Sequence, residues 1–100
     1  MGRGGFSDER WRQIAQTLRS VAPCDRVAVF GSRAKGTWRE GSDVDPAVWG
    51  SAWDLPRAER ARDLLEESCF PWSFDVVLPE RIRNQELIDH IERVGFDIGE

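Results

Sequence analysis

The chain has few cysteines and no long apolar run. These two absences argue against a membrane-spanning protein and against a disulfide-rich secreted protein. No stretch of its 100 residues approaches the roughly 20 consecutive apolar residues that cross a membrane, and the glycine-rich start lacks the apolar segment of a signal peptide. Cys24 and Cys69 do not have the spacing of metal ligands, so we expect both to be reduced and packed. These absences predict a cytoplasmic location.

Lysine is almost missing as well. Lys35 is the only lysine among 14 basic residues, a bias that a GC-rich genome explains as well as function does. The net charge of −4 disfavours sequence-independent binding to nucleic acid, although it leaves room for a local basic patch. We therefore expect neither nucleic acid nor a membrane as partner.

What is present is typical of a small globular protein. Hydrophobic residues make up 40% of the chain and charged residues 32%, without repeats, linkers or low-complexity segments. A chain of this length forms one domain, here 1–100, and has no room for a separate substrate domain. We expect 1–6 to be mobile because this stretch is rich in glycine.

The first informative stretch is a strand that ends in a glycine. Arg26–Phe30 is short, apolar and rich in β-formers, and Gly31 then allows a tight turn and the close approach of a ligand. Ser32 can cap a helical turn whose free N–H groups would point at an anion. Arg33 and Lys35 could add positive charge for a triphosphate. A Gly-Ser pair by itself is often only a turn.

The second informative stretch carries paired carboxylates. If Asp43-Val44-Asp45 is extended, both aspartates leave the same face, about 6.5 Å apart at Cα, and Val44 points into the core. Two such carboxylates favour a cation between them, and oxygen ligands select Mg²⁺ or Mn²⁺. Taken alone, the pair could also be an acidic turn. A P-loop is a poor interpretation because no Gly-Lys-Ser/Thr follows the glycine.

Periodicity predicts the other elements. Strands alternate with helices, which indicates an α/β (α+β) domain, although the pattern does not decide between a parallel and a mixed sheet. The predicted helices run from Ser7 to just before Pro23, from Leu55 to Ser68, and from Asn84 to Gly95; the further strands are Val44–Trp49 and Ser73–Leu78.

Two residues do not suit the strands that contain them. Pro46 has no N–H and belongs at an edge, a strand start or a bulge, so it puts the local pairing in doubt. Asp75 lies among apolar neighbours, where a carboxylate needs a cation or several donors; the alternative is an exposed aspartate on an edge strand.

Together these stretches resemble a known motif. A strand ending in Gly-Ser, ten residues, and then Asp-x-Asp opening a second strand is similar to the defining motif of nucleotidyltransferases related to DNA polymerase beta. At this length the chain resembles the minimal nucleotidyltransferase family, many of whose members act as antitoxins. The resemblance covers most of the chain and implies a small mixed sheet of three to four strands backed by helices. Pro46 departs from it, because relatives usually have an aliphatic residue there.

The resemblance also implies site residues and chemistry. Asp43 and Asp45 would hold two Mg²⁺ or Mn²⁺ ions, and Asp75 would hold the ion nearer the acceptor and help remove its proton. The phosphates of ATP would lie in a cradle formed by Gly31, Ser32, Arg33 and Lys35. The expected reaction transfers a nucleoside monophosphate, AMP from ATP, to a hydroxyl group.

The acceptor must come from another molecule, since no second domain exists to bind it. The resemblance points to a tyrosine of a HEPN-type toxin. Two alternatives stay open: a binding antitoxin with a vestigial site, favoured by five tryptophans and an arginine-bearing helix, and transfer to a small molecule.

Overall fold

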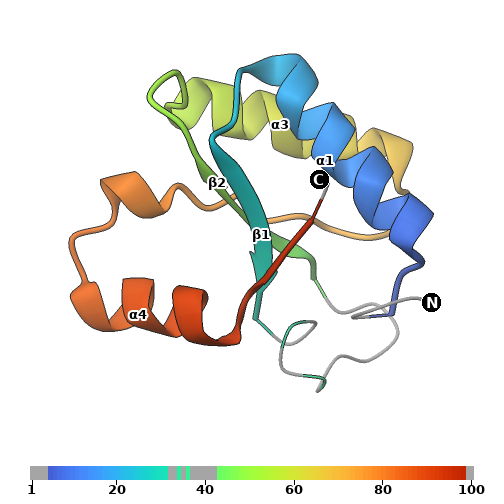
Figure 1. Cartoon of the computed structure of the whole chain (residues 1–100). Helices are drawn as coiled ribbons and strands as arrows, with labels where there is room; N and C mark the ends of the chain where they lie inside the picture. Colours follow the sequence, from blue (N-terminus) through green and yellow to red (C-terminus); the bar gives the residue numbers. More distant parts are fainter. Residues whose placement is uncertain (1–4, 32–33, 35, 37–42, 99–100) are drawn as a thin grey trace.

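The computed structural model describes residues 5–31, 34, 36 and 43–98 of the chain. In chain order the elements are α1 (Asp8–Val21), β1 (Arg26–Phe30), β2 (Asp45–Trp49), α3 (Leu55–Ser68), a 3-10 turn η1 (Pro79–Arg81), α4 (Gln85–Val94) and β3 (Phe96–Asp97). The mixture of helices with a small sheet confirms the predicted α+β class. Figure 1 shows α1 and α3 together on one side of the strands and α4 on the other.

The sheet is antiparallel, with strand order β2-β1-β3. β1 is central, and its last residue, Phe30, pairs with Asp45 at the start of β2. β3 pairs with β1 through Phe96, so the C-terminal segment forms a strand that the sequence did not predict. Phe96 and Ile98 are both buried, so the C-terminal segment packs against the domain.

The predicted strand Ser73–Leu78 is wrong as a continuous element. This segment lies parallel to β2 but makes only two isolated bridges, Val44 with Phe74 and Ala47 with Val77. Pro46 provides the physical reason. In a parallel ladder, the residue at position 46 would donate its backbone N–H to the carbonyl of Asp75. Proline has no N–H, so this hydrogen bond between the two bridges is missing.

The main core lies between the sheet and the helices α1 and α3. Each of these helices begins at a side chain that accepts a backbone N–H: Ser7 from Arg10 at 3.1 Å and Asp54 from Arg57 at 3.0 Å. The predicted start of the first helix and both ends of the second are confirmed. Fully buried side chains that fill this layer are Ile14, Leu18, Val27, Val29, Val44, Val48 and Leu65.

The opposite face of the sheet is covered by α4. Ala28 and Ala47 are fully buried there, outside the main core cluster, and α4 contributes the buried Ile91. The rest of the apolar stripe on this helix is only partly covered, since Leu87 remains 39% exposed. Gly95 follows the helix with an extended φ of −71°, and a Cβ on it would collide with the carbonyl oxygen of Ile91. This glycine therefore permits close approach.

Two expectations about the N-terminal end and the thiols can be compared with the structure. Phe6 does not fit the expected mobile start, because its ring is buried and lies 4.9 Å from that of Trp11. Cys24 and Cys69 are both free thiols, as predicted. Among the helices that the structure describes, none is both long and apolar enough to cross a membrane.

Candidate active site

The site begins with a sharp bend after β1. Gly31 has a φ of +75°, which L side chains rarely adopt, and its carbonyl accepts the N–H of Ala34 at 3.2 Å. A Cβ on Gly31 would collide with Oδ2 of Asp45. The bend and the carboxylate of Asp45 are therefore in direct contact, and only glycine leaves room for that carboxylate. Three predicted phosphate-binding residues, Ser32, Arg33 and Lys35, lie outside the described residues.

Asp45 and Asp75 are neighbours across two adjacent chain segments. The bridges Val44–Phe74 and Ala47–Val77 have the same offset in residue number, so Asp45 lies opposite Asp75. Adjacent strands are about 4.8 Å apart, which sets the scale for the backbone separation of these two residues. The structure thus brings together two of the three predicted acids.

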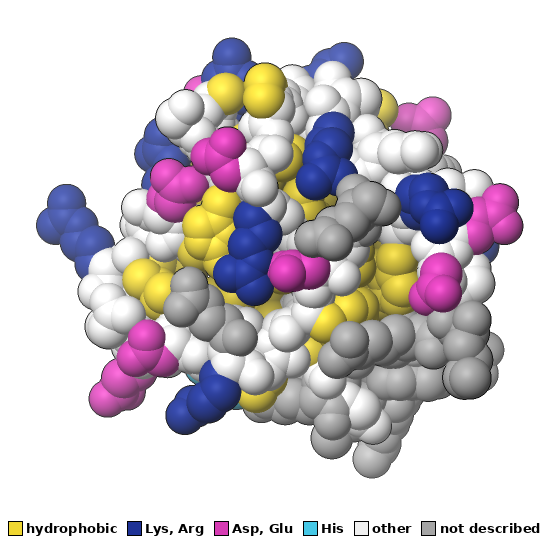
Figure 2. Space-filling view, in the orientation of Figure 1, with side chains coloured by type: hydrophobic (Ala, Val, Ile, Leu, Met, Phe, Trp, Pro, Cys, Tyr) yellow, Lys and Arg dark blue, Asp and Glu magenta, His cyan; other side chains and the backbone are white. Residues whose placement is uncertain are grey.

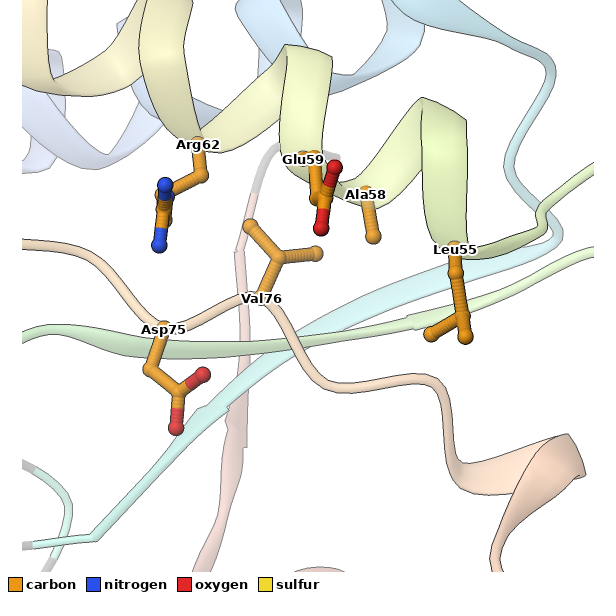
Figure 3. A pocket seen from close by; sticks show the side chains of 6 residues that line it. All are labelled: Leu55, Ala58, Glu59, Arg62, Asp75 and Val76. Atoms are coloured by element: carbon orange, nitrogen blue, oxygen red, sulfur yellow. The ribbon is translucent and has the colours of Figure 1, made fainter.

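Their side chains also leave the same face. Val44 and Phe74, one position earlier on each segment, are buried in the main core, and side chains alternate along extended chain. Figure 3 shows this alternation in the segment that carries Asp75: Val76 points toward α3, whereas the carboxylate of Asp75 points away from it. Asp75 is exposed and Asp45 is half-buried.

Asp43 precedes the first bridge and is exposed. Among the residues that the structure describes, no three His, Cys, Asp or Glu side chains form a group ready to hold a metal ion. The donors nevertheless suit a hard divalent cation, since Asp43, Asp45 and Asp75 offer only carboxylate oxygens, and Asp45 and Asp75 occupy opposite positions on adjacent segments. Neighbouring carboxylates repel, which opposes a closed cluster of the side chains alone.

A groove of about 200 Å³ lies on the opposite side of the Asp75 segment. It runs between this segment, which contributes Asp75 and Val76, and α3; the α3 side is lined by Leu55, Ala58, Glu59 and Arg62. Asp75 belongs to this lining, but its carboxylate points away from α3 and therefore away from the groove.

Comparison with known proteins decides the family. The nucleotidyltransferase domain family matches residues 11–95. The chain belongs to this family. Its reaction class is therefore nucleotidyl transfer, and the match includes the bend at Gly31 and all three acids.

Solved structures share the fold of this nucleotidyltransferase. A chain of a toxin–antitoxin complex with AMP-PNP superposes with a TM-score of 0.77 at 21% identity, covering 92% of this chain and 72% of that one. A complex of tri-AMPylated Shewanella oneidensis HEPN toxin with MNT antitoxin gives 0.71 at 19% identity, with 89% and 68% covered. A Sulfolobus solfataricus protein described as a putative nucleotidyltransferase gives 0.54 at 14% identity, with 97% and 87% covered. No curated protein matches the chain.

One residue near the site of this nucleotidyltransferase could not be found from the sequence. Glu66, on α3, accepts the backbone N–H of Phe74 at 3.0 Å, immediately before Asp75. In the sequence Glu66 is one of several acidic residues on an amphipathic helix, and nothing distinguishes it from Glu67. Only the packing of α3 against the later segment reveals the contact.

Proposed function

We propose that this nucleotidyltransferase transfers AMP from ATP to a tyrosine hydroxyl of a HEPN-type toxin and thereby acts as its antitoxin. The observation that carries the proposal is the placement of Asp45 opposite Asp75, on one face and beside the bend at Gly31. The likeness to toxin–antitoxin complexes, one with AMP-PNP and one with an AMPylated HEPN toxin, supports the choice of nucleotide and partner. Because the reaction consumes ATP, we place it in the cytoplasm.

The carboxylates define where divalent cations would bind. Asp43 and Asp45 would hold two Mg²⁺ or Mn²⁺ ions, and Asp75 would share the ion nearer the acceptor. Such ions neutralise charge that develops on the transferred phosphoryl group, a major contribution to catalysis in this class of reaction. The all-oxygen donor set is the chemical argument for these metals.

The transfer step is a displacement at the α-phosphorus of ATP. The acceptor oxygen forms a bond to this phosphorus, the bond to the bridging oxygen breaks, and pyrophosphate leaves with its electrons. The proton of the acceptor hydroxyl passes to Asp75, whose exposed carboxylate points away from α3 and is open to an incoming molecule. The bend at Gly31, with Ser32, Arg33 and Lys35, would hold the β- and γ-phosphates.

A protein acceptor agrees with the composition of the surface. Charged side chains of both signs are interspersed over the face in Figure 2, with apolar side chains exposed between them. Leu55 and Phe70 are 65% and 82% exposed, so both are available to contact a partner protein. A partner protein would bring the acceptor hydroxyl to this face.

The exposed apolar residues also support a second candidate function. The protein could neutralise a toxin by binding alone, with a vestigial transferase site. The incompletely covered stripe of α4, with Leu87 at 39% exposure, would suit such an interface. Transfer to a small molecule is a weaker candidate, because the carboxylate of Asp75 points away from the groove beside α3.

Labelling with α-³²P-ATP distinguishes these functions. The protein, Mg²⁺ and a HEPN-type toxin, sought as the product of the neighbouring gene, should give a labelled toxin, and Asp45→Asn should abolish the label while retaining toxin binding. Asp63→Asn, an exposed aspartate on α3, serves as the matched control and should label normally. An Asp45→Asn variant that neutralises the toxin as well as wild type would favour binding alone. Absence of label with all four nucleoside triphosphates would contradict the proposed reaction.

A further inference from the structure

The segment that carries Asp75 is hydrogen-bonded along both of its edges, to β2 on one and to α3 on the other. Toward β2 its backbone makes four hydrogen bonds: Val44 N–H to the Ser73 carbonyl, Asp75 N–H to Val44, Val77 N–H to Pro46, and Val48 N–H to Val77, each 2.9 Å. On the outer side Oε2 of Glu66 accepts the N–H of Phe74 at 3.0 Å. The outer contact involves a side chain, because α3 rather than another strand lies beside this edge.

The contact with Glu66 compensates for a weakness at Asp75. The rung that Pro46 cannot make is the one that would bind the carbonyl of Asp75, so β2 holds this residue only through its N–H. Glu66 holds the preceding residue, whose own N–H faces away from β2. A carboxylate that accepts a partly buried backbone N–H makes a stronger hydrogen bond than a neutral acceptor.

We propose that Glu66 is a positioning residue, which keeps Asp75 opposite Asp45 by holding the backbone at Phe74. The inference rests on the proposed function for its catalytic consequence, because Asp75 matters there as a ligand and proton acceptor. Glu66 acts through the peptide that precedes Asp75. Residues that orient metal ligands typically affect metal affinity or activity about 10-fold to 100-fold.

The test compares three variants of the full chain. Glu66→Ala removes the acceptor, whereas Glu66→Gln retains an oxygen at the same reach. Glu67→Ala is the matched control: it removes a carboxylate from the next position of α3, one that is exposed and has no hydrogen bond to the part of the chain that the structure describes. Two properties are measured: amide hydrogen exchange at Asp75 and Val77, and the Mg²⁺ concentration that gives half-maximal transfer.

We expect Glu66→Ala to speed amide exchange at Asp75 and Val77 by about 10-fold or more and to raise the half-maximal Mg²⁺ concentration by about 10-fold. Glu66→Gln, which keeps a neutral acceptor, should lie between wild type and Glu66→Ala in both measurements, and Glu67→Ala should equal wild type. Unchanged exchange in Glu66→Ala overturns the inference, as does a Glu66→Gln variant as impaired as Glu66→Ala. Faster exchange with an unchanged Mg²⁺ requirement overturns the catalytic role.

The two measurements separate this inference from the proposed function. If wild-type protein transfers no nucleotide, the proposed function fails, and the exchange rates still decide whether Glu66 fastens the segment. If wild type transfers AMP and Glu66→Ala exchanges at the wild-type rate, the proposed function stands and the positioning role is excluded.

Discussion

Asp45 at the start of β2 lies opposite Asp75 on the neighbouring parallel segment, and both side chains leave the face of the strands away from α1 and α3. Two like charges placed opposite each other destabilise paired strands by a fraction of a kcal/mol to about 1 kcal/mol. A divalent cation bound between the two carboxylates would remove this repulsion, and such binding is the use we propose for the pair.

Replacing Asp45 or Asp75 with a neutral residue should lower transfer activity but should not lower the stability of the metal-free protein. Asp75→Asn should lower the transfer rate by at least about 100-fold, because the site loses a charged ligand and the proton acceptor. The same change should raise the melting temperature in EDTA by about 1 to 6 °C, because it relieves repulsion from Asp45. Differential scanning fluorimetry with and without Mn²⁺ checks this: wild type should gain stability from Mn²⁺ and the variant should not. A variant that melts below wild type in EDTA would contradict the predicted repulsion.

Substitution of two glycines tests the contact between the bend and Asp45. Gly31 and Gly36 both have positive φ, +75° and +82°, so alanine should cost each about 1 to 2 kcal/mol of backbone strain. At Gly36 no described atom lies within 4 Å of a new Cβ, whereas at Gly31 the Cβ would meet the carboxylate of Asp45. Gly31→Ala should therefore destabilise the fold more than Gly36→Ala does.

The two glycine variants should also differ in activity. We expect Gly31→Ala to lose transfer activity because Asp45 is displaced. Chemical denaturation and the labelling assay measure the two effects. Equal losses of stability in the two variants would show that the Asp45 contact contributes nothing.

Replacing Pro46 with a residue that has a backbone N–H should strengthen the pairing between β2 and the segment that carries Asp75. Pro46→Val restores an N–H opposite the carbonyl of Asp75, and a hydrogen bond of this kind is worth about 0.5 to 1.5 kcal/mol. Loss of a proline makes the unfolded chain less restricted, at a cost of about 0.4 to 1 kcal/mol, so the net change in stability should be small. Amide exchange at Asp75 and Val77 should nevertheless slow.

Pro56→Ala, in the first turn of α3, is the control for Pro46→Val, since it loses a proline without gaining a bond. It should only destabilise. Faster exchange at Val77 in Pro46→Val would show that the missing rung is not what interrupts the ladder.

Much of the fold follows from local sequence signals. The capping residues Ser7, Asp54 and Asn84 each accept a backbone N–H at a helix start, and apolar residues at helical spacing mark the faces that pack on the sheet. The first strand was predicted with its observed bounds, because a short β-branched run ends at a glycine. Such signals depend on a few neighbouring residues, so a single sequence contains them.

The remaining features depend on contacts between distant residues. β3 is only two residues long, and its pairing with Ala28 and Val29 has no local signature. To predict the interruption of the Ser73–Leu78 strand, one must know that the backbone nitrogen and carbonyl of Pro46 point toward that segment, although Pro46 also pairs with Val29 of β1. For the site, the sequence indicated Asp45 and Asp75 by type and spacing, but it could not give their register or the role of Glu66, which comes from α3 packing beside Phe74.

The thiol of Cys24 should respond to alkaline pH. Burial raises the pKa of Cys24 above its ordinary value of 9.0, with a smaller increase from Asp25 and opposing effects from a hydrogen bond with Trp53 and from Arg19. Because the folded-state pKa is raised, the associated stability is fully present below pH 9 and is lost as pH rises through the folded-state value. Iodoacetamide should label the native thiol slowly at pH 8, and Cys24→Ala should flatten the decline of melting temperature above pH 9. Rapid labelling at pH 8 would contradict a raised pKa.

The central claim is that Asp45 and Asp75 share a divalent cation beside the bend at Gly31. Titration of Mn²⁺ followed by electron paramagnetic resonance, in the presence of AMP-PNP, measures this binding directly in wild type, Asp75→Ala and the control Asp63→Asn. We predict that wild type and Asp63→Asn bind Mn²⁺ equally well and that Asp75→Ala binds at least about 10-fold more weakly. Equal Mn²⁺ affinity in wild type and Asp75→Ala would contradict the claim.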